Sequence, residues 1–211
     1  MRRFPSTRLR LLLLTYSLFC VAPCFAQNQT PRIKCDDLRL APALVTYDPK
    51  AWREIISQPG GFSILFPGLP CEQAGTVSSN LGPLEIHLYT MVLQQGDGFA
   101  SCAVSYNDMP VVANGSDQIK RALDGGRNGL IANNNGKLVS ESEISLGQYT
   151  GRSIKIEMPD HIFRGKMYVV RNRIYQVVVR LPKDADTSKT TRDNLSAIAD
   201  RFLNSLKVVD Q

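Results

Sequence analysis

The stretch that most constrains the fold is RGKMYVVRNRIYQVVVRL, from Arg164 to Leu181. Two runs of β-branched and aromatic residues meet at Arg171-Asn172, which predicts a β-hairpin with Tyr168 opposite Tyr175. The asparagine of this loop is expected to adopt the positive φ that a tight hairpin turn requires. Because side chains alternate along a strand, one face of the hairpin is continuously apolar and the other is mixed. The hairpin is therefore expected in the middle of a sheet that helices cover.

Segments before the hairpin also have the pattern of strands. Between residues 52 and 106, short alternating runs are separated by turns rich in glycine, proline and asparagine, which predicts an antiparallel meander. Two further strands are expected at residues 137–146 and 149–158. Together with the hairpin, these segments predict a long antiparallel sheet.

Two amphipathic segments predict helices. The first starts at Asn114 or Ser116 and contains three glycines, which indicate either a close approach to the sheet or an early break. The second starts at Thr187 or Ser188 and has apolar residues at helical spacing. Its apolar stripe consists of Leu195, Ile198, Ala199, Phe202 and Leu206. An antiparallel β-sheet flanked by two main α-helices gives an α+β fold, an α/β sandwich.

Residues 1–26 have the features of a secretory signal peptide: four arginines, an apolar run over residues 11–22, and small residues at Cys24 and Ala26. The apolar run is about half the roughly 20 residues that a membrane span needs. We therefore expect cleavage after Ala26, a mature chain with no transmembrane segment, and a secreted or periplasmic location in a bacterial envelope. Lipid attachment at Cys24 is the disfavoured alternative, because Pro23 and Phe25 flank it.

The mature chain is expected to form one domain. Residues 27–50 predict an extended lead-in, and residues 51–211 predict a single α+β domain long enough to bury roughly 70% of its unfolded surface. Loss of the leader lowers the formal charge from +6 to +2. Nucleic acid is not expected as a partner, because the basic residues of the hairpin are interpreted as a solvated sheet edge. These residues are Arg164, Lys166, Arg171, Arg173, Arg180 and Lys183.

The mature chain keeps three cysteines, Cys35, Cys71 and Cys102, in a compartment that permits disulfides. In the predicted meander, Cys71 lies near Val92 and Cys102 near Met91, two strands apart and on opposite faces. Two strand spacings come to about 9.6 Å, more than the roughly 7 Å between Cα atoms that a disulfide can span. A bridge between Cys35 and Cys71 is therefore expected, with Cys102 as a buried free thiol. The alternatives are three reduced cysteines or a bond to another chain.

A catalytic interpretation rests on Cys102, His87 and Asp108, which offer a nucleophile, a base and an orienting carboxylate. Cys102 lies in a smooth strand, however, and not at a helix start or sharp turn where a thiolate is stabilised. No catalytic residue is assigned for this reason.

Metal and anion sites are also considered. His161 with Asp160 and Glu157 offers imidazole and carboxylate ligands, but a zinc site usually has three or four ligands and no residue spacing here predicts such a set. Arg152 offers an anion contact, although an arginine at a strand start is more often solvated or paired with a carboxylate. No metal site and no cofactor site is assigned.

Several phrases in order resemble secreted bacterial members of the PsbP-like group, named for an extrinsic subunit on the lumenal side of photosystem II. They are GGFSILFPGLP at residues 60–70, VSYND at 104–108, GRSIKIE at 151–157 and RGKMYVVRNRIYQVVV at 164–179. The resemblance covers residues 52–208. It implies a curved antiparallel sheet flanked by helices, in a non-catalytic protein that binds other proteins or a membrane complex. The secretion leader differs from a plant transit peptide, so a photosynthetic role is not carried over.

Two functions from different classes follow. The favoured one is a secreted or periplasmic, non-catalytic binding or accessory module that contacts another protein or an envelope complex. The alternative is a small cysteine-dependent hydrolase that uses Cys102 and His87. An exposed apolar patch favours the first function, whereas a pocket that brings Cys102 and His87 within about 4 Å favours the second.

Overall fold

The computed structural model describes residues 33–34, 44–79, 82–110, 115–183 and 187–209. The predicted hairpin is present as β10 (His161–Val170) and β11 (Arg173–Pro182), and Tyr168 pairs with Tyr175 as expected. The positive φ of its loop falls on Arg171, at 59°, and not on Asn172. The prediction for the asparagine was therefore wrong, because a tight hairpin turn can place its left-handed residue at the first loop position.

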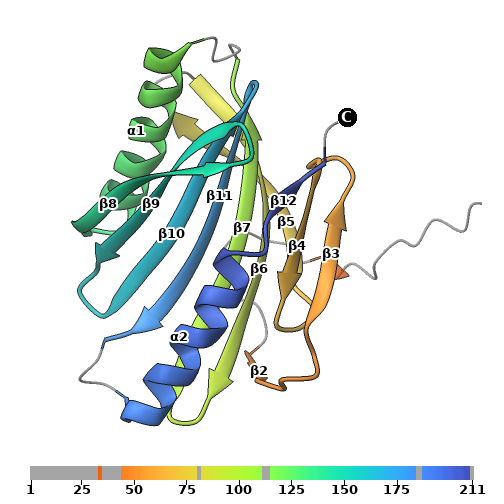
Figure 1. Ribbon diagram of the computed structural model, residues 1–211, viewed down its shortest axis with the longest axis vertical. Helices are drawn as coiled ribbons and strands as arrows, with labels where there is room; N and C mark the ends of the chain where they lie inside the picture. Colours follow the sequence, from red (N-terminus) through yellow and green to blue (C-terminus); the bar gives the residue numbers. More distant parts are fainter. Residues whose placement is uncertain (1–32, 35–43, 80–81, 111–114, 184–186, 210–211) are drawn as a thin grey trace, which may run out of the picture.

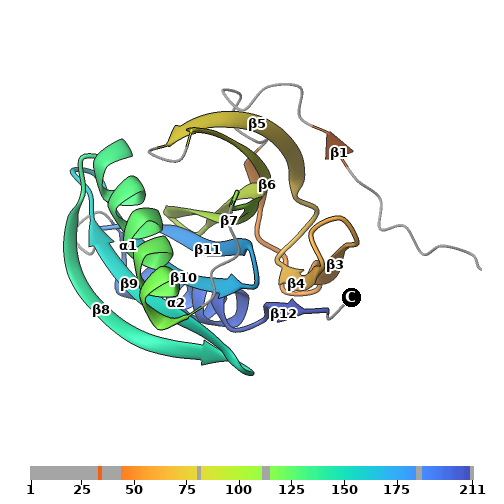
Figure 2. The same cartoon turned by 90° about the horizontal axis from the view of Figure 1, so that it is seen from above.

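These two strands lie inside a large, mostly antiparallel sheet that curves strongly (Figures 1 and 2). Among the described residues the sheet has nine strands. It is mixed, since β1 pairs in parallel with β5, and β2 (Leu44–Thr46) pairs in parallel with β6. On one side of the hairpin, the strands from the edge inward are β1 (Ile33–Lys34), β5 (Cys71–Ser79), β6 (Gly82–Gln95) and β7 (Gly98–Asp108), and β7 pairs with β11. On the other side, β10 pairs with β9 (Tyr149–Glu157), which pairs with the edge strand β8 (Lys137–Leu146).

The hairpin is not a sheet edge, because β7 flanks β11 and β9 flanks β10. Its basic side chains are instead held by polar partners on neighbouring elements. Arg164 pairs with Asp200, and Arg173 pairs with Asp108. The interpretation of these charges as edge protection is therefore wrong.

A small second sheet contains β3 (Arg53–Ser57), β4 (Phe62–Phe66) and β12 (Lys207–Val208). The predicted meander is therefore split: β5, β6 and β7 form it within the large sheet, whereas β3 and β4 leave it. Pro67, Gly68 and Pro70 separate β4 from β5 and interrupt strand pairing there, which allows the chain to change sheets.

Two helices cover opposite faces of the large sheet, α1 (Ser116–Asn133) and α2 (Lys189–Leu203) (Figure 2). Ser188 caps α2 and accepts a hydrogen bond from the Thr191 amide, in agreement with one of the two predicted caps. The cap of α1 is Gly115, without a side-chain hydrogen bond, so Ser116 is not its cap. α1 is continuous, and Gly126 allows its close approach to the sheet, because a Cβ there would lie 3.2 Å from the Ile174 side chain. The predicted α+β class is confirmed.

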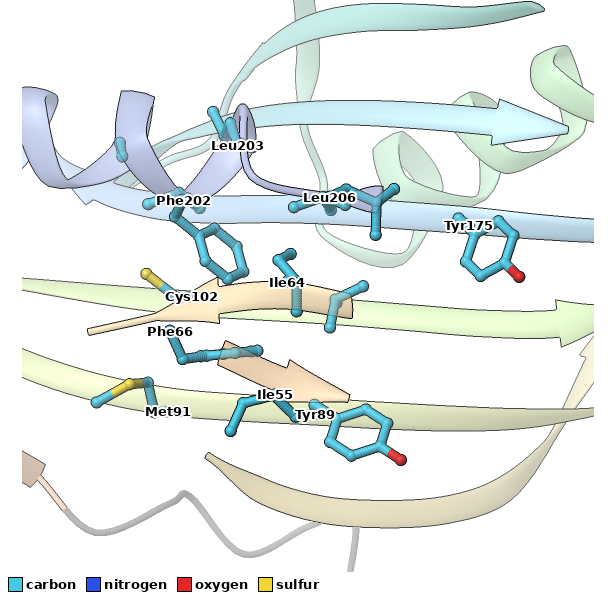
Figure 3. Close-up of a cluster of buried hydrophobic side chains, with 14 of the residues drawn as sticks. Ile55, Ile64, Phe66, Tyr89, Met91, Cys102, Tyr175, Phe202, Leu203 and Leu206 are labelled. Atoms are coloured by element: carbon cyan, nitrogen blue, oxygen red, sulfur yellow. The ribbon is translucent and has the colours of Figure 1, made fainter. Parts of the chain in front are cut away.

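Buried apolar residues form one cluster on each face of the large sheet. The cluster under α2 also includes the small sheet, and there the Phe66 and Phe202 rings lie 4.8 Å apart (Figure 3). The cluster under α1 centres on Leu123, Met167 and Ile174. Both faces of the hairpin are thus buried, as its alternating apolar pattern indicated.

Candidate binding cleft

The structure does not bring the predicted catalytic residues together. Cys102 has no exposed surface, and burial raises the pKa of its thiol to about 12. It pairs with Met91, whereas His87 pairs with Tyr106, four residues further along β7. Four residues of strand span about 14 Å, so His87 is too far away to deprotonate this thiol.

His87 and Asp108 belong instead to a cluster around Tyr106. The His87 ring stacks on the Tyr106 ring at 4.6 Å, and the Arg173 guanidinium lies 4.6 Å from the centre of the same ring. Arg173 also donates to both carboxylate oxygens of Asp108, at 2.6 and 2.8 Å. These hydrogen bonds lower the pKa of Asp108.

The same cluster connects the two sheets. Arg173 donates to the carbonyl oxygen of Pro59, and the Tyr175 hydroxyl donates to that of Gly60, in the turn between β3 and β4. Phe62 contacts the rings of Tyr106 and Tyr175 edge-on. Several residues that carry the PsbP-like resemblance therefore meet at one place, where their observed contacts are structural.

The other candidate residues of the sequence are also paired within the fold. Arg152 donates to Asp124 of α1 and to Glu141 of β8, as expected for an arginine held by carboxylates. His161 hydrogen-bonds to Asp160. Across the described ranges, no three potential metal ligands lie close enough together to form a site.

Cys71 forms a disulfide, and Cys102 is a buried free thiol. Cys71 lies opposite Thr90 and not Val92, a register two residues from the prediction, but it is still two strands from Cys102. Cys35 lies outside the described residues, so its bond to Cys71 stays a prediction.

A concave site lies beside α2. This helix packs against β7 and β11, and β8 and β9 extend beyond it (Figure 1). A hollow of about 290 Å³ opens between the flank of the helix and the exposed part of the sheet. Its polar lining includes Ser140, Ser153, Lys155, Arg164, Lys166, Asp200 and Asn204. We call this hollow the α2 cleft.

Contacts between sheet and helix hold two basic side chains of the α2 cleft in place. Arg164 donates to Ser196 and forms an ion pair with Asp200. The Lys166 ammonium donates to the Asn204 amide oxygen at 2.6 Å. Partial burial lowers the pKa of Lys166, with a smaller contribution in the same direction from Arg164. Side chains of α2 and its C-terminal end therefore hold Arg164 and Lys166 in place.

A second hollow, of about 540 Å³, shares Asp200 and Asn204 with the α2 cleft. It lies between the C-terminal turn of α2 and the small sheet, where it is lined by Glu54, Leu65 and Lys207 among others. The two shared residues place the hollows next to each other at the end of the helix, and we call the pair the groove around the end of α2.

Sequence reasoning found the basic residues of the hairpin and the polar side of the last helix, but it did not find the cleft. The sequence pattern around Lys155 indicates only that this residue lies in an alternating strand, and it does not indicate a binding site. The missing information was the position of α2 over the sheet.

No family model matches the chain, and no curated protein matches it. Among solved structures, the chain is similar to the solution structure of cyanobacterial PsbP (CyanoP) from Synechocystis sp. PCC 6803, at 11% sequence identity and a TM-score of 0.46. The match covers 82% of this chain and 96% of that one. In the part of the chain that the structure describes, no helix is both long and apolar enough to cross a bilayer.

Proposed function

We propose that this protein is a non-catalytic binding or accessory module, secreted or periplasmic in a bacterial envelope, that contacts another protein or an envelope complex. The observation that carries the proposal is the groove around the end of α2. It is concave and open to solvent, its α2-cleft part has a mainly polar lining, and contacts within the fold hold two of its basic side chains. A preorganised site of this kind reduces the entropy that binding costs.

The hydrolase alternative has less support. It needs a reactive thiolate, whereas burial keeps Cys102 protonated and away from solvent. It also needs a nearby base, and the His87 ring stacks on Tyr106 instead.

The proposed location depends on the leader, which lies outside the described residues. N-terminal sequencing of the released protein should begin at Gln27, directly after the predicted cleavage site at Ala26. An acylated Cys24 or an uncleaved leader would contradict this part of the proposal.

The binding proposal can be tested by affinity purification from the native envelope with three baits. The first is the mature chain, and the second carries Ser140→Trp, which places an indole in the α2 cleft. The third carries Ser145→Trp, a matched control on the same strand but on the opposite face of the sheet, because strand side chains alternate. A partner should be retained by the first and third baits and lost from the second. Recovery of no partner, or equal recovery with all three baits, would refute the proposal.

A further inference from the structure

The α2 cleft has an excess of positive charge. Among the described residues, Lys155, Arg164 and Lys166 line it, against the single carboxylate of Asp200. Asp200 is already bound to Arg164, so the charge of this arginine is largely compensated. The two lysines account for the remaining charge.

Neither lysine has a carboxylate partner among the residues that the structure describes. Lys166 donates to a neutral amide, that of Asn204. Lys155 is exposed on β9 next to Lys166 on β10, since Lys155 pairs with Arg164 and Ser153 pairs with Lys166 across these strands. The hydroxyls of Ser140 and Ser153 line the same hollow and add two potential hydrogen-bond donors. The lining is therefore suited to carboxylate oxygens, which accept several hydrogen bonds at once.

The shape of the groove distinguishes between possible anions. Past Asp200 and Asn204 the groove continues into the second hollow, where Glu54 pairs with Lys207 at 3.7 Å and the charges are balanced. A long polyanion such as nucleic acid would have to run through that hollow and meet its carboxylates, whereas a short acidic peptide can bind in the α2 cleft alone. A flat membrane surface would not enter a concave site. A peptide can present acidic residues to the cleft and other residues beyond it.

Building on the proposed binding function, we propose that the α2 cleft recognises an acidic peptide segment of the partner protein, whose carboxylates bind Lys155 and Lys166. Arg164 positions the site through its contacts with Asp200 and Ser196. Ser140 and Ser153 donate hydrogen bonds to the same carboxylates. The segment continues as an extended chain around the end of α2.

A hexaglutamate peptide with blocked ends and a fluorescent label is the probe, and a hexaglutamine peptide is its uncharged match. Binding to the mature protein is followed by fluorescence anisotropy at low and at high salt. The hexaglutamate peptide should bind at low salt and weaken as salt rises, and the hexaglutamine peptide should not bind. Lys155→Glu and Lys166→Glu should each weaken binding by about tenfold, because each replaces an attraction by a repulsion.

The control variant is Lys120→Glu, which makes the same charge change on α1, on the other face of the sheet. It should bind hexaglutamate as tightly as the unchanged protein does. Lys155 is exposed, so its variant keeps the test valid even if Lys166→Glu does not fold. Equal affinity of Lys155→Glu and the unchanged protein would refute the inference, as would equal weakening by Lys120→Glu.

Inorganic phosphate and vesicles that contain anionic lipid form the other arms of the test. Tighter binding of either one than of hexaglutamate, lost in Lys155→Glu, would show that the cleft serves a different anion and would overturn the peptide proposal. The envelope experiment separates the two proposals. A partner that Lys155→Glu and the unchanged protein retain equally, but that Ser140→Trp loses, would leave the binding function standing and refute its acidic character.

Discussion

Replacing Phe202 by alanine should remove a large part of the stability of the fold. Its ring has no exposed surface and packs on Phe66, with ring centres 4.8 Å apart, in the cluster that joins α2 to both sheets. Truncation of a buried phenylalanine costs about 3 to 5 kcal/mol. A domain is commonly stable by only about 5 to 15 kcal/mol. For a chain of this length, the midpoint of thermal unfolding should therefore fall by about 6 to 20 °C.

Urea unfolding followed by the fluorescence of Trp52, the one tryptophan of the chain, measures this loss. Arg201 of α2 lies over the Trp52 ring at 4.2 Å, so the probe also reports whether the helix is docked. Phe99→Ala is the matched control, because the same side chain at that position is 50% exposed. It should cost less than about 1 kcal/mol.

A loss below about 1 kcal/mol for Phe202→Ala would refute the packing argument and would place α2 away from the sheet in solution. A double-mutant cycle with Phe66→Ala gives a second check. The two residues should couple by about 0.5 to 1.5 kcal/mol, as edge-on aromatic pairs do. Additive effects would show that the ring contact itself contributes little.

Three further predictions concern titratable and sulfur-containing groups. Because burial raises the pKa of the Cys102 thiol, iodoacetamide should leave it unmodified in the native protein and label it in urea. Rapid labelling of the native protein would contradict the burial of Cys102. Hydrogen bonds from Arg173 lower the pKa of Asp108 below its ordinary 3.8. The ion pair between Arg173 and Asp108 therefore stabilises the fold at neutral pH, and this stabilisation is lost as the pH falls through the lowered pKa of Asp108. Asp108→Asn should therefore lower the free energy of unfolding by up to about 1 kcal/mol at pH 7, the side chain being half exposed, and by much less at pH 2, as pH-dependent urea titrations would measure. Non-reducing peptide mapping should link Cys71 to Cys35, and a link from Cys71 to Cys102 would contradict the strand order.

The elements that depend on nearby residues could be predicted from the sequence. Tyr168 and Tyr175 are seven residues apart, and the loop between them fixes their pairing, so the hairpin follows from its alternating pattern and its turn. The start of α2 follows from Ser188, which reaches an amide only three residues away. The cap of α1 was not predicted because it is Gly115, which has no side chain to signal it; the predicted Asn114 lies outside the described residues.

Only the tertiary structure decided which strands share a sheet and where the cleft lies. Phe62 pairs with Val208 from the other end of the chain, and this pairing helps to place β4 in the small sheet and not in the meander. Lys155, Lys166 and Asp200 line the same hollow only because α2 packs beside this part of the sheet and leaves it uncovered. A pattern of alternating side chains tells which face of a strand is buried, but it does not tell which strand or helix becomes its neighbour. Which elements become neighbours depends on how the buried faces of the whole chain fit together. The position of the proposed binding site depends on the same packing.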